Sequence, residues 1–197
     1  MNDAHLQFLA SPEWAQMLET ELLPWLLEST DLGDDVLEVG PGPGLTTDLL
    51  RQRVAKVTAV ELEPDLAAAL AARLADTNVV VLHGDATASG LDANRFSAAT
   101  CFSMLHHVPA PEIQDQVFVE LYRVLRPGGT LVAVDSVDDD VIRQFHEDDV
   151  FVPIDPDKLP SRLEAIGFSD VRVEVGGIGG YEVRFTAVKP GGTPQAQ

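Results

Sequence analysis

Short apolar runs alternate with helical stretches along most of this chain, from about residue 35 onward. The runs have the length and the β-branched content of buried strands, and the stretches between most of them repeat their apolar residues at helical spacing. The predicted strands are 35–39, 57–61, 79–82, 98–103 and 130–135, and the predicted helices are 46–53, 64–75 and 111–125. Strands separated by such helices form right-handed crossovers, so the pattern predicts a doubly wound parallel sheet with helices on both faces.

The first 30 residues follow a different pattern and are predicted to form a helical leader that caps the site. Ser11 supplies a helix N-cap and Pro12 fits the first helical turn, and apolar residues then recur at helical spacing. Pro24 is expected to kink or divide this leader, because proline removes a backbone donor inside a helix.

The C-terminal part of the chain predicts an antiparallel addition to the sheet. A helix is expected at about 157–166, and Gly167 fits its C-cap. Two strands, 171–175 and 181–188, are joined by the glycine-rich segment 176–180. The complete prediction is an α/β Rossmann-like sheet of seven strands, mostly parallel, with an antiparallel C-terminal pair.

Length and composition predict one globular domain. With 197 residues, 45% hydrophobic and 23% charged, the chain can build a single core flanked by two helix layers. We assign the main domain to residues 31–189, and we expect residues 190–197, rich in Pro, Gly and Gln, to be a disordered tail.

Charge and cysteine content limit the partners and the compartment. The chain has 13 basic and 32 acidic residues, a net charge of −19, which disfavours binding to nucleic acid or to an anionic membrane surface. The acidity itself is most simply a solubility feature. No apolar run reaches ~20 residues, residues 1–10 lack the pattern of a secretory signal, and Cys101 is the single cysteine. These features predict a cytoplasmic protein, and they leave its oligomeric state open.

The first predicted strand runs directly into three glycines at alternate positions. Gly40, Gly42 and Gly44 follow the acidic residue Glu38, so the segment has the pattern E-x-G-x-G-x-G. A dinucleotide fingerprint would need a glycine where Leu45 stands, and no Lys-Ser or Lys-Thr pair completes a P-loop. A glycine-rich turn at this point still brings the backbone close to a nucleotide-like ligand, although glycines also make ordinary tight turns.

Two acidic residues follow at the ends of the next two strands. Glu61 lies about 20 residues after the glycine-rich turn, where a carboxylate can accept hydrogen bonds from both hydroxyls of a ribose. Asp85 follows the third strand. Each also has a simpler interpretation, Glu61 as a polar strand end and Asp85 as the cap of a short helix.

With these residues in this order, the chain resembles the class I S-adenosylmethionine-dependent methyltransferases. The run Leu105–Val108 and the helix-to-strand turn at 121–130 are similar to the small-molecule, type 11 branch, which includes quinone-biosynthesis enzymes. The resemblance implies S-adenosylmethionine as cofactor. It implies cofactor contacts from Glu38, Gly40, Pro41, Gly42, Gly44, Thr46, Glu61, Leu62, Asp85, Ala86 and Ser103.

The resemblance also suggests roles for several of these residues. Glu61 would bind the ribose and Leu62 would pack on the adenine. Asp85 would accept from the adenine amino group, and the backbone amide of Ala86 would reach a ring nitrogen. Glu38 is expected to orient the glycine-rich turn or a water near the methionine amino group, rather than to take part in the chemistry. One position departs from the family, because Ser97 stands where an acid is usual, which puts local packing in doubt.

Methyl transfer is an in-line displacement, so the protein mainly aligns the acceptor and excludes water. His106 and His107 are the candidate general bases for an acceptor that must lose a proton. Adjacent residues point in different directions, so we expect at most one of them to reach the acceptor. Alternatively, both only shape their loop. Aromatic residues such as Phe8, Trp14, Phe145 and His146 could form apolar walls of the acceptor pocket or could belong to the core.

Acidic residues in 135–149 raise the possibility of a metal site, because dense carboxylates bind hard divalent ions. Metal-dependent relatives carry an Asp just after the fourth strand, however, and this chain has Ser103 and Met104 there. We therefore expect no metal and interpret the acidic segment as a solvated face.

The sequence thus predicts a methyltransferase that uses S-adenosylmethionine to methylate an O, N or C atom of a small molecule. Two alternatives remain: methylation of a protein or peptide side chain, and cofactor binding without turnover.

Overall fold

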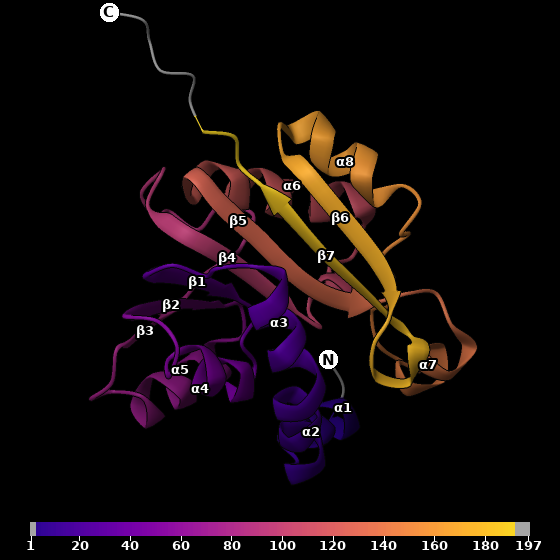
Figure 1. Cartoon of the computed structure of the whole chain (residues 1–197). Coiled ribbons are helices and arrows are strands. Elements are labelled where there is room, and N and C mark those ends of the chain that lie inside the picture. The colour runs from indigo at the N-terminus through magenta and orange to yellow at the C-terminus, as the bar shows by residue number, and fades with distance from the viewer. Residues whose placement is uncertain (1–2, 192–197) are drawn as a thin grey trace, which may run out of the picture.

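The computed structural model describes residues 3–191, with side chains for 6–177 and 179–191 (Figure 1). Residues 192–197, most of the tail predicted to be disordered, lie outside the described residues. Among those described, no helix combines the length and the apolar character needed to cross a membrane.

A seven-stranded sheet forms the centre of the molecule, in the order β3-β2-β1-β4-β5-β7-β6. Its first five strands are mutually parallel, and β7 is antiparallel to both of its neighbours. The strands are β1 (Asp35–Val39), β2 (Lys56–Glu61), β3 (Val79–His83), β4 (Phe96–Phe102), β5 (Leu125–Ser136), β6 (Ser169–Gly176) and β7 (Glu182–Val188). The predicted fold class is therefore confirmed, including the antiparallel C-terminal pair.

Helices cover both faces of this sheet, as the apolar spacing predicts (Figure 1). On one face, α6 (Pro111–Val124) and α8 (Leu159–Ile166) pack into an apolar cluster around Phe118 and Leu163. On the other face, α4 (Leu45–Leu50), α5 (Pro64–Arg73) and the leader share a second cluster that includes Leu26 and Leu70. Burial on both faces explains why the parallel strands read as continuous apolar runs.

The leader consists of α1 (Asp3–Leu9), α2 (Pro12–Met17), a π-helical segment (Leu18–Leu22) and α3 (Leu23–Ser29). Ser11 caps α2, because its hydroxyl accepts the backbone N–H of Trp14 over 3.1 Å. The interruption expected at Pro24 lies just before it, where the N–H of Leu23 donates to the carbonyl of Leu18. This wider turn lets the chain stay helical through a proline that has no N–H to donate.

Ser97, the residue that departs from the family pattern, is well accommodated. Its buried hydroxyl accepts the backbone N–H groups of Asp34 (3.1 Å) and Asp35 (3.0 Å) and lies 2.7 Å from the carbonyl oxygen of Leu32, to which it can donate. The packing between β1 and β4 therefore does not depend on an acid at this position.

Two shorter helical elements complete the region beyond β4 and β5. A 3-10 turn (Leu105–His107) follows β4, and α7 (Asp140–Phe145) follows β5. The N–H of Val152, in the segment after α7, donates to the carbonyl of His106 over 2.8 Å. This contact holds the segment beside the 3-10 turn.

Candidate active site

A cavity of about 580 Å³ opens at the carboxyl edge of the parallel strands. Its wall comes from the segments that follow β1, β2, β3 and β4, with Leu9 and Trp14 added from the leader. Such an edge, near the point where the strand order reverses, is where open α/β sheets bind ligands. Predicted site residues on the wall are Gly40, Pro41, Gly42, Thr46, Glu61, Leu62, Asp85, Ala86, Ser103 and His107. Glu38, Gly44 and His106 lie outside this wall.

The three glycines after β1 have positive φ angles but different surroundings. A Cβ on Gly42 would meet no atom within 4 Å, and Gly42 lies on the cavity wall. A Cβ on Gly44 would lie 2.3 Å from Leu70 Cδ1, so this glycine allows α4 to pack closely on α5. The backbone at Gly42 is therefore open to a ligand, whereas Gly44 serves the packing of the helices.

Glu61 braces this turn from the neighbouring strand. Its Oε2 accepts the N–H of Gly42 over 3.0 Å, and its Oε1 accepts the N–H of Glu63 over 3.0 Å. The side chain is buried yet lines the cavity. Glu61 thus fixes the turns after β1 and β2 relative to each other, a role that its sequence position alone does not reveal.

Glu38 lies beneath the turn and contacts the start of α4. Its carboxyl group accepts hydrogen bonds from the hydroxyls of Thr46 and of Thr47, the latter over 2.6 Å. Burial raises the pKa of Glu38 to about 7, and the two threonine hydroxyls only partly oppose this rise. Glu38 therefore ties the end of β1 to the first turn of α4, directly behind the glycine-rich turn.

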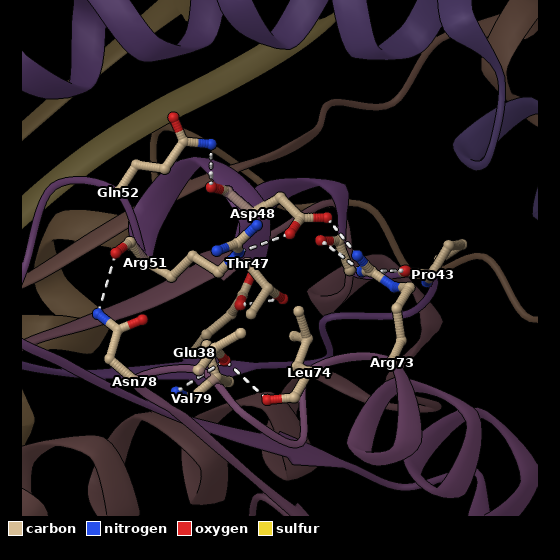
Figure 2. A network of polar contacts seen from close by, with 12 residues as sticks. Glu38, Pro43, Thr47, Asp48, Arg51, Gln52, Arg73, Leu74, Asn78 and Val79 are labelled. Atoms are coloured by element: carbon tan, nitrogen blue, oxygen red, sulfur yellow. Dashed lines mark hydrogen bonds and ion pairs between the residues drawn. The ribbon is translucent and has the colours of Figure 1, made fainter.

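Asp48 and Arg73 connect the same region to α5 (Figure 2). Arg73 pairs with Asp48 over 2.5 Å and donates to the carbonyl oxygens of Pro43 (3.1 Å) and Gly44 (3.2 Å). Asp48 also pairs with Arg51 over 2.7 Å. Sequence reasoning missed Arg73, because its partners lie 25 to 30 residues away along the chain.

Residues at the far end of the cavity come from the segments after β2 and β3. Leu62 is 60% exposed and lies on the cavity wall, so its apolar side chain is available to a ligand there. Asp85 also lines the cavity, and its Oδ1 accepts both the N–H and the hydroxyl of Thr87 over 2.8 Å. In the described chain no helix follows Asp85 before β4, so the helix-cap interpretation does not apply; the side chain instead stabilises a turn at the cavity wall.

A smaller hollow of about 240 Å³ adjoins the main cavity. Leu9, Trp14 and Ser103 line both. Phe8, His106, Asp135, Phe145 and His146 are among the residues that line the smaller hollow. Ser103 has a φ of +52°, a left-handed conformation that is uncommon outside glycine and that turns the chain at the end of β4.

Asp135, at the end of β5, organises the histidine turn. Its carboxylate accepts the backbone N–H groups of Met104 (3.1 Å), Leu105 (2.7 Å) and His106 (3.2 Å). Its Oδ1 also lies 2.7 Å from Nδ1 of the buried His106. Burial alone would raise the pKa of Asp135, but His106 and the backbone donors outweigh it and hold that pKa below its usual value.

The two predicted catalytic histidines line different spaces, His107 the main cavity and His106 the smaller hollow. A third histidine, His146, follows α7 and has ring-centroid distances of 4.8 Å to His106 and 5.3 Å to His107. Burial lowers the pKa of His146. The sequence offered His146 only as one possible wall residue, because nothing local brings it to the histidine pair.

The strand order, the glycine-rich turn and the cavity at the carboxyl edge define a doubly wound domain of the Rossmann-like methyltransferase class. Residues 37–133, about half of the chain, match the family model described as a methyltransferase domain. In this central segment the chain is similar to the methyltransferase-domain family, and over nearly its whole length it has the fold of the S-adenosylmethionine-dependent methyltransferases.

Individual relatives agree with this assignment. A ubiquinone biosynthesis O-methyltransferase of Pseudomonas entomophila is 36% identical over 110 residues, which cover 53% of this chain and 46% of the relative. The match thus spans less than half of that relative's length.

Solved structures show the same fold over nearly the whole chain. A SAM-dependent methyltransferase from Aquifex aeolicus has a TM-score of 0.72 at 22% identity, covering 96% of this chain and 99% of its own. A Haemonchus contortus phosphoethanolamine N-methyltransferase, solved with phosphomonomethylethanolamine and S-adenosylhomocysteine, has a TM-score of 0.70 at 17% identity. It covers 90% of this chain and 53% of its own.

Proposed function

We propose that this chain is an S-adenosylmethionine-dependent methyltransferase that methylates an oxygen, nitrogen or carbon atom of a small molecule. The single observation that carries the proposal is the cavity in which the open backbone of Gly42 meets the carboxylate of Glu61. The family match at residues 37–133 and the O-methyltransferase relatives support the same activity.

The residues around the cavity fit the proposed cofactor. The volume of about 580 Å³ falls in the usual range for small-molecule sites. Glu61 offers a carboxylate to ribose hydroxyls, Leu62 offers an exposed apolar surface to an adenine ring, and Asp85 offers an acceptor to its amino group. S-adenosylmethionine, when bound, supplies a methyl group on a positively charged sulfur.

The residues of the chain then have three tasks in the proposed reaction. The backbone at Gly40 and Gly42 positions the donor, and the leader residues Leu9 and Trp14 cover the cavity and exclude water. His107, on the wall, can take a proton from the acceptor, whereas His106 is held by Asp135 on the side of the smaller hollow.

A small acceptor is favoured over a protein side chain. The hollow next to the cavity measures about 240 Å³ and is lined by the leader and by residues near α7, which leaves little room for an extended peptide. The names of the relatives further favour an oxygen atom as the acceptor. We also propose a cytoplasmic location, supported by the single cysteine, Cys101, which is buried and unpaired.

Two measurements test the proposal. Isothermal titration with S-adenosylhomocysteine should give one site per chain, and titration with NADH should give none. Incubation with methyl-labelled cofactor and a metabolite extract should then yield a labelled small molecule. Failure to bind either form of the cofactor would overturn the whole proposal. Binding without any labelled product would favour a non-catalytic binding protein, and label on peptide substrates alone would favour the side-chain methyltransferase.

A further inference from the structure

Three histidines from two separate segments converge between the cavity and the smaller hollow. One ring nitrogen from each of His106, His107 and His146 lies within 4.8 Å of those of the other two. The ring centroids of His106 and His107 are 4.2 Å apart. His106 and His146 are buried, and His107 is partly buried.

Neighbouring groups fix which ring nitrogen two of these histidines can present. His146 Nδ1 lies 2.7 Å from the carbonyl oxygen of Ile142, which can only accept, so Nδ1 carries the proton. His106 Nδ1 lies 2.7 Å from Asp135 Oδ1, an oxygen that also accepts the backbone N–H groups of His106 and Ser136, so Nδ1 donates its proton to it. When the His106 and His146 rings are neutral, each therefore carries its lone pair on Nε2.

This arrangement is the one that metal-binding histidines require. Histidine ligands in proteins donate their second ring N–H to a carboxylate or a backbone carbonyl, which orients the ring and raises its basicity. Here Asp135 and Ile142 occupy those two roles, and Asp149 Oδ2 adds a negative charge 3.9 Å from Nδ1 of His107.

We propose that His106, His107 and His146 bind one divalent transition-metal ion of the zinc class. Imidazole nitrogens bind Zn²⁺ and other late first-row transition metals far better than they bind Mg²⁺ or Ca²⁺. A tetrahedral zinc site has ligand nitrogens roughly 3.4 Å apart, so the three side chains would close slightly from their present separation. Three protein ligands leave one coordination position open, as in catalytic rather than structural zinc sites.

The place of the site suggests what that open position could hold. His107 lines the main cavity, and His106 and His146 line the smaller hollow, so the ion would lie where the two spaces meet. A metal there would lower the pKa of a bound acceptor hydroxyl, and in the loaded protein His107 would act as a ligand rather than as a base. This use of the metal rests on the proposed function, whereas the binding of the metal does not.

From sequence alone, the acidic residues of 135–149 are the candidate metal ligands, and the absence of an Asp after β4 predicts that no metal binds. The histidine site depends instead on His146, which packs beside the pair through α7. The acidic residues contribute through Asp135 and Asp149, which contact histidines and need not touch the ion.

The test is zinc binding by the full chain after removal of metals with a chelator. Isothermal titration with Zn²⁺ should give one tight site in the wild type, and Co²⁺ should give the visible absorption of a tetrahedral nitrogen-rich site. His146→Ala should weaken Zn²⁺ binding at least about 100-fold. His83→Ala, which removes an exposed histidine at the end of β3, is the matched control and should leave Zn²⁺ binding unchanged.

Titration with S-adenosylhomocysteine separates the two proposals. Because His146 does not line the main cavity, His146→Ala should bind this ligand as the wild type does, which also shows that the variant is folded. If His146→Ala fails to fold, His146→Gln serves in its place. Equal Zn²⁺ affinity in the wild type and the His146 variant would overturn the metal site alone. Normal Zn²⁺ binding without S-adenosylhomocysteine binding would instead overturn the proposed function and leave the metal site standing.

Discussion

The carboxylate of Glu61 accepts the backbone N–H of Gly42 over 3.0 Å, which ties the end of β2 to the turn after β1. The residue expected to bind a ribose therefore also fixes the turn on which the ligand would rest. Buried hydrogen bonds to an ionised carboxylate are stronger than neutral ones, so one side chain influences both the shape and the chemistry of the site.

Glu61→Ala should weaken S-adenosylhomocysteine binding by roughly 10- to 100-fold and destabilise the fold by about 1–3 kcal/mol, because the N–H of Gly42 loses its buried acceptor. Glu61→Gln should give an intermediate loss, since an amide can accept from one of the two N–H groups but not from both. Titration calorimetry and urea unfolding measure the two effects. An affinity equal to that of the wild type would contradict the assigned role.

Gly42→Ala and Gly44→Ala should have opposite main effects. At Gly42 the new methyl group meets no other atom within 4 Å, but the φ of +53° strains a side chain there; we expect a stability loss of about 1 kcal/mol and a larger loss of ligand affinity, because Gly42 lies on the cavity wall. At Gly44 it meets Leu70, so we expect a loss of about 1–3 kcal/mol in the free energy of unfolding. Comparing calorimetric Kd values with urea midpoints separates the two, and the same pattern in both variants would refute the distinction.

Glu38 should make the stability depend on pH. Its pKa is raised from 4.5 to about 7 in the folded chain, so between these values the folded state binds more protons than the unfolded state. Its contribution is fully present below pH 4.5 and is lost as pH rises through 7, by at most about 3 kcal/mol.

Glu38→Gln, which resembles the protonated side chain, should lack this dependence. Urea unfolding of both proteins at pH 5 and pH 8 measures it. The wild type should lose stability relative to Glu38→Gln at the higher pH, and parallel behaviour of the two would exclude the raised pKa.

Ser97→Ala should destabilise the chain by about 1–3 kcal/mol, because two backbone N–H groups at the start of β1 lose their acceptor. Ser161→Ala, at an exposed serine that contacts only the carbonyl of Lys158 among its assigned hydrogen bonds, should change stability by less than about 0.5 kcal/mol. Cofactor affinity should be unaffected in both. Equal thermal midpoints for the two variants would show that the Ser97 hydroxyl is dispensable.

Local pattern was enough to predict the strands and the glycine-rich turn. Strands buried on both faces appear as continuous apolar runs, and backbone positions with positive φ angles are occupied by glycines. β1 has the predicted bounds, and Gly167 ends α8 in the left-handed conformation expected of a C-cap. The resemblance added the acidic residues, and Glu61 and Asp85 both lie on the cavity wall.

What the sequence did not predict depends on contacts between distant segments. Arg73 meets Asp48 across 25 residues, and Asp135 meets His106 across 29. The position of His146 depends on how α7 folds back, for which no local pattern exists. Ser97 replaces an acid without loss because its hydroxyl meets backbone groups of Leu32, Asp34 and Asp35, 62 to 65 residues earlier, which no local pattern around β4 reveals.

Leu9 and Trp14 border both the main cavity and the smaller hollow, so one pair of leader side chains is shared by the two spaces. A movement of α1 and α2 that opened one space would open the other as well. For the proposed methyltransferase, such a movement would expose the cofactor and the acceptor together. Steady-state kinetics should therefore show a sequential mechanism, and a product trapped in one space should delay exchange in the other.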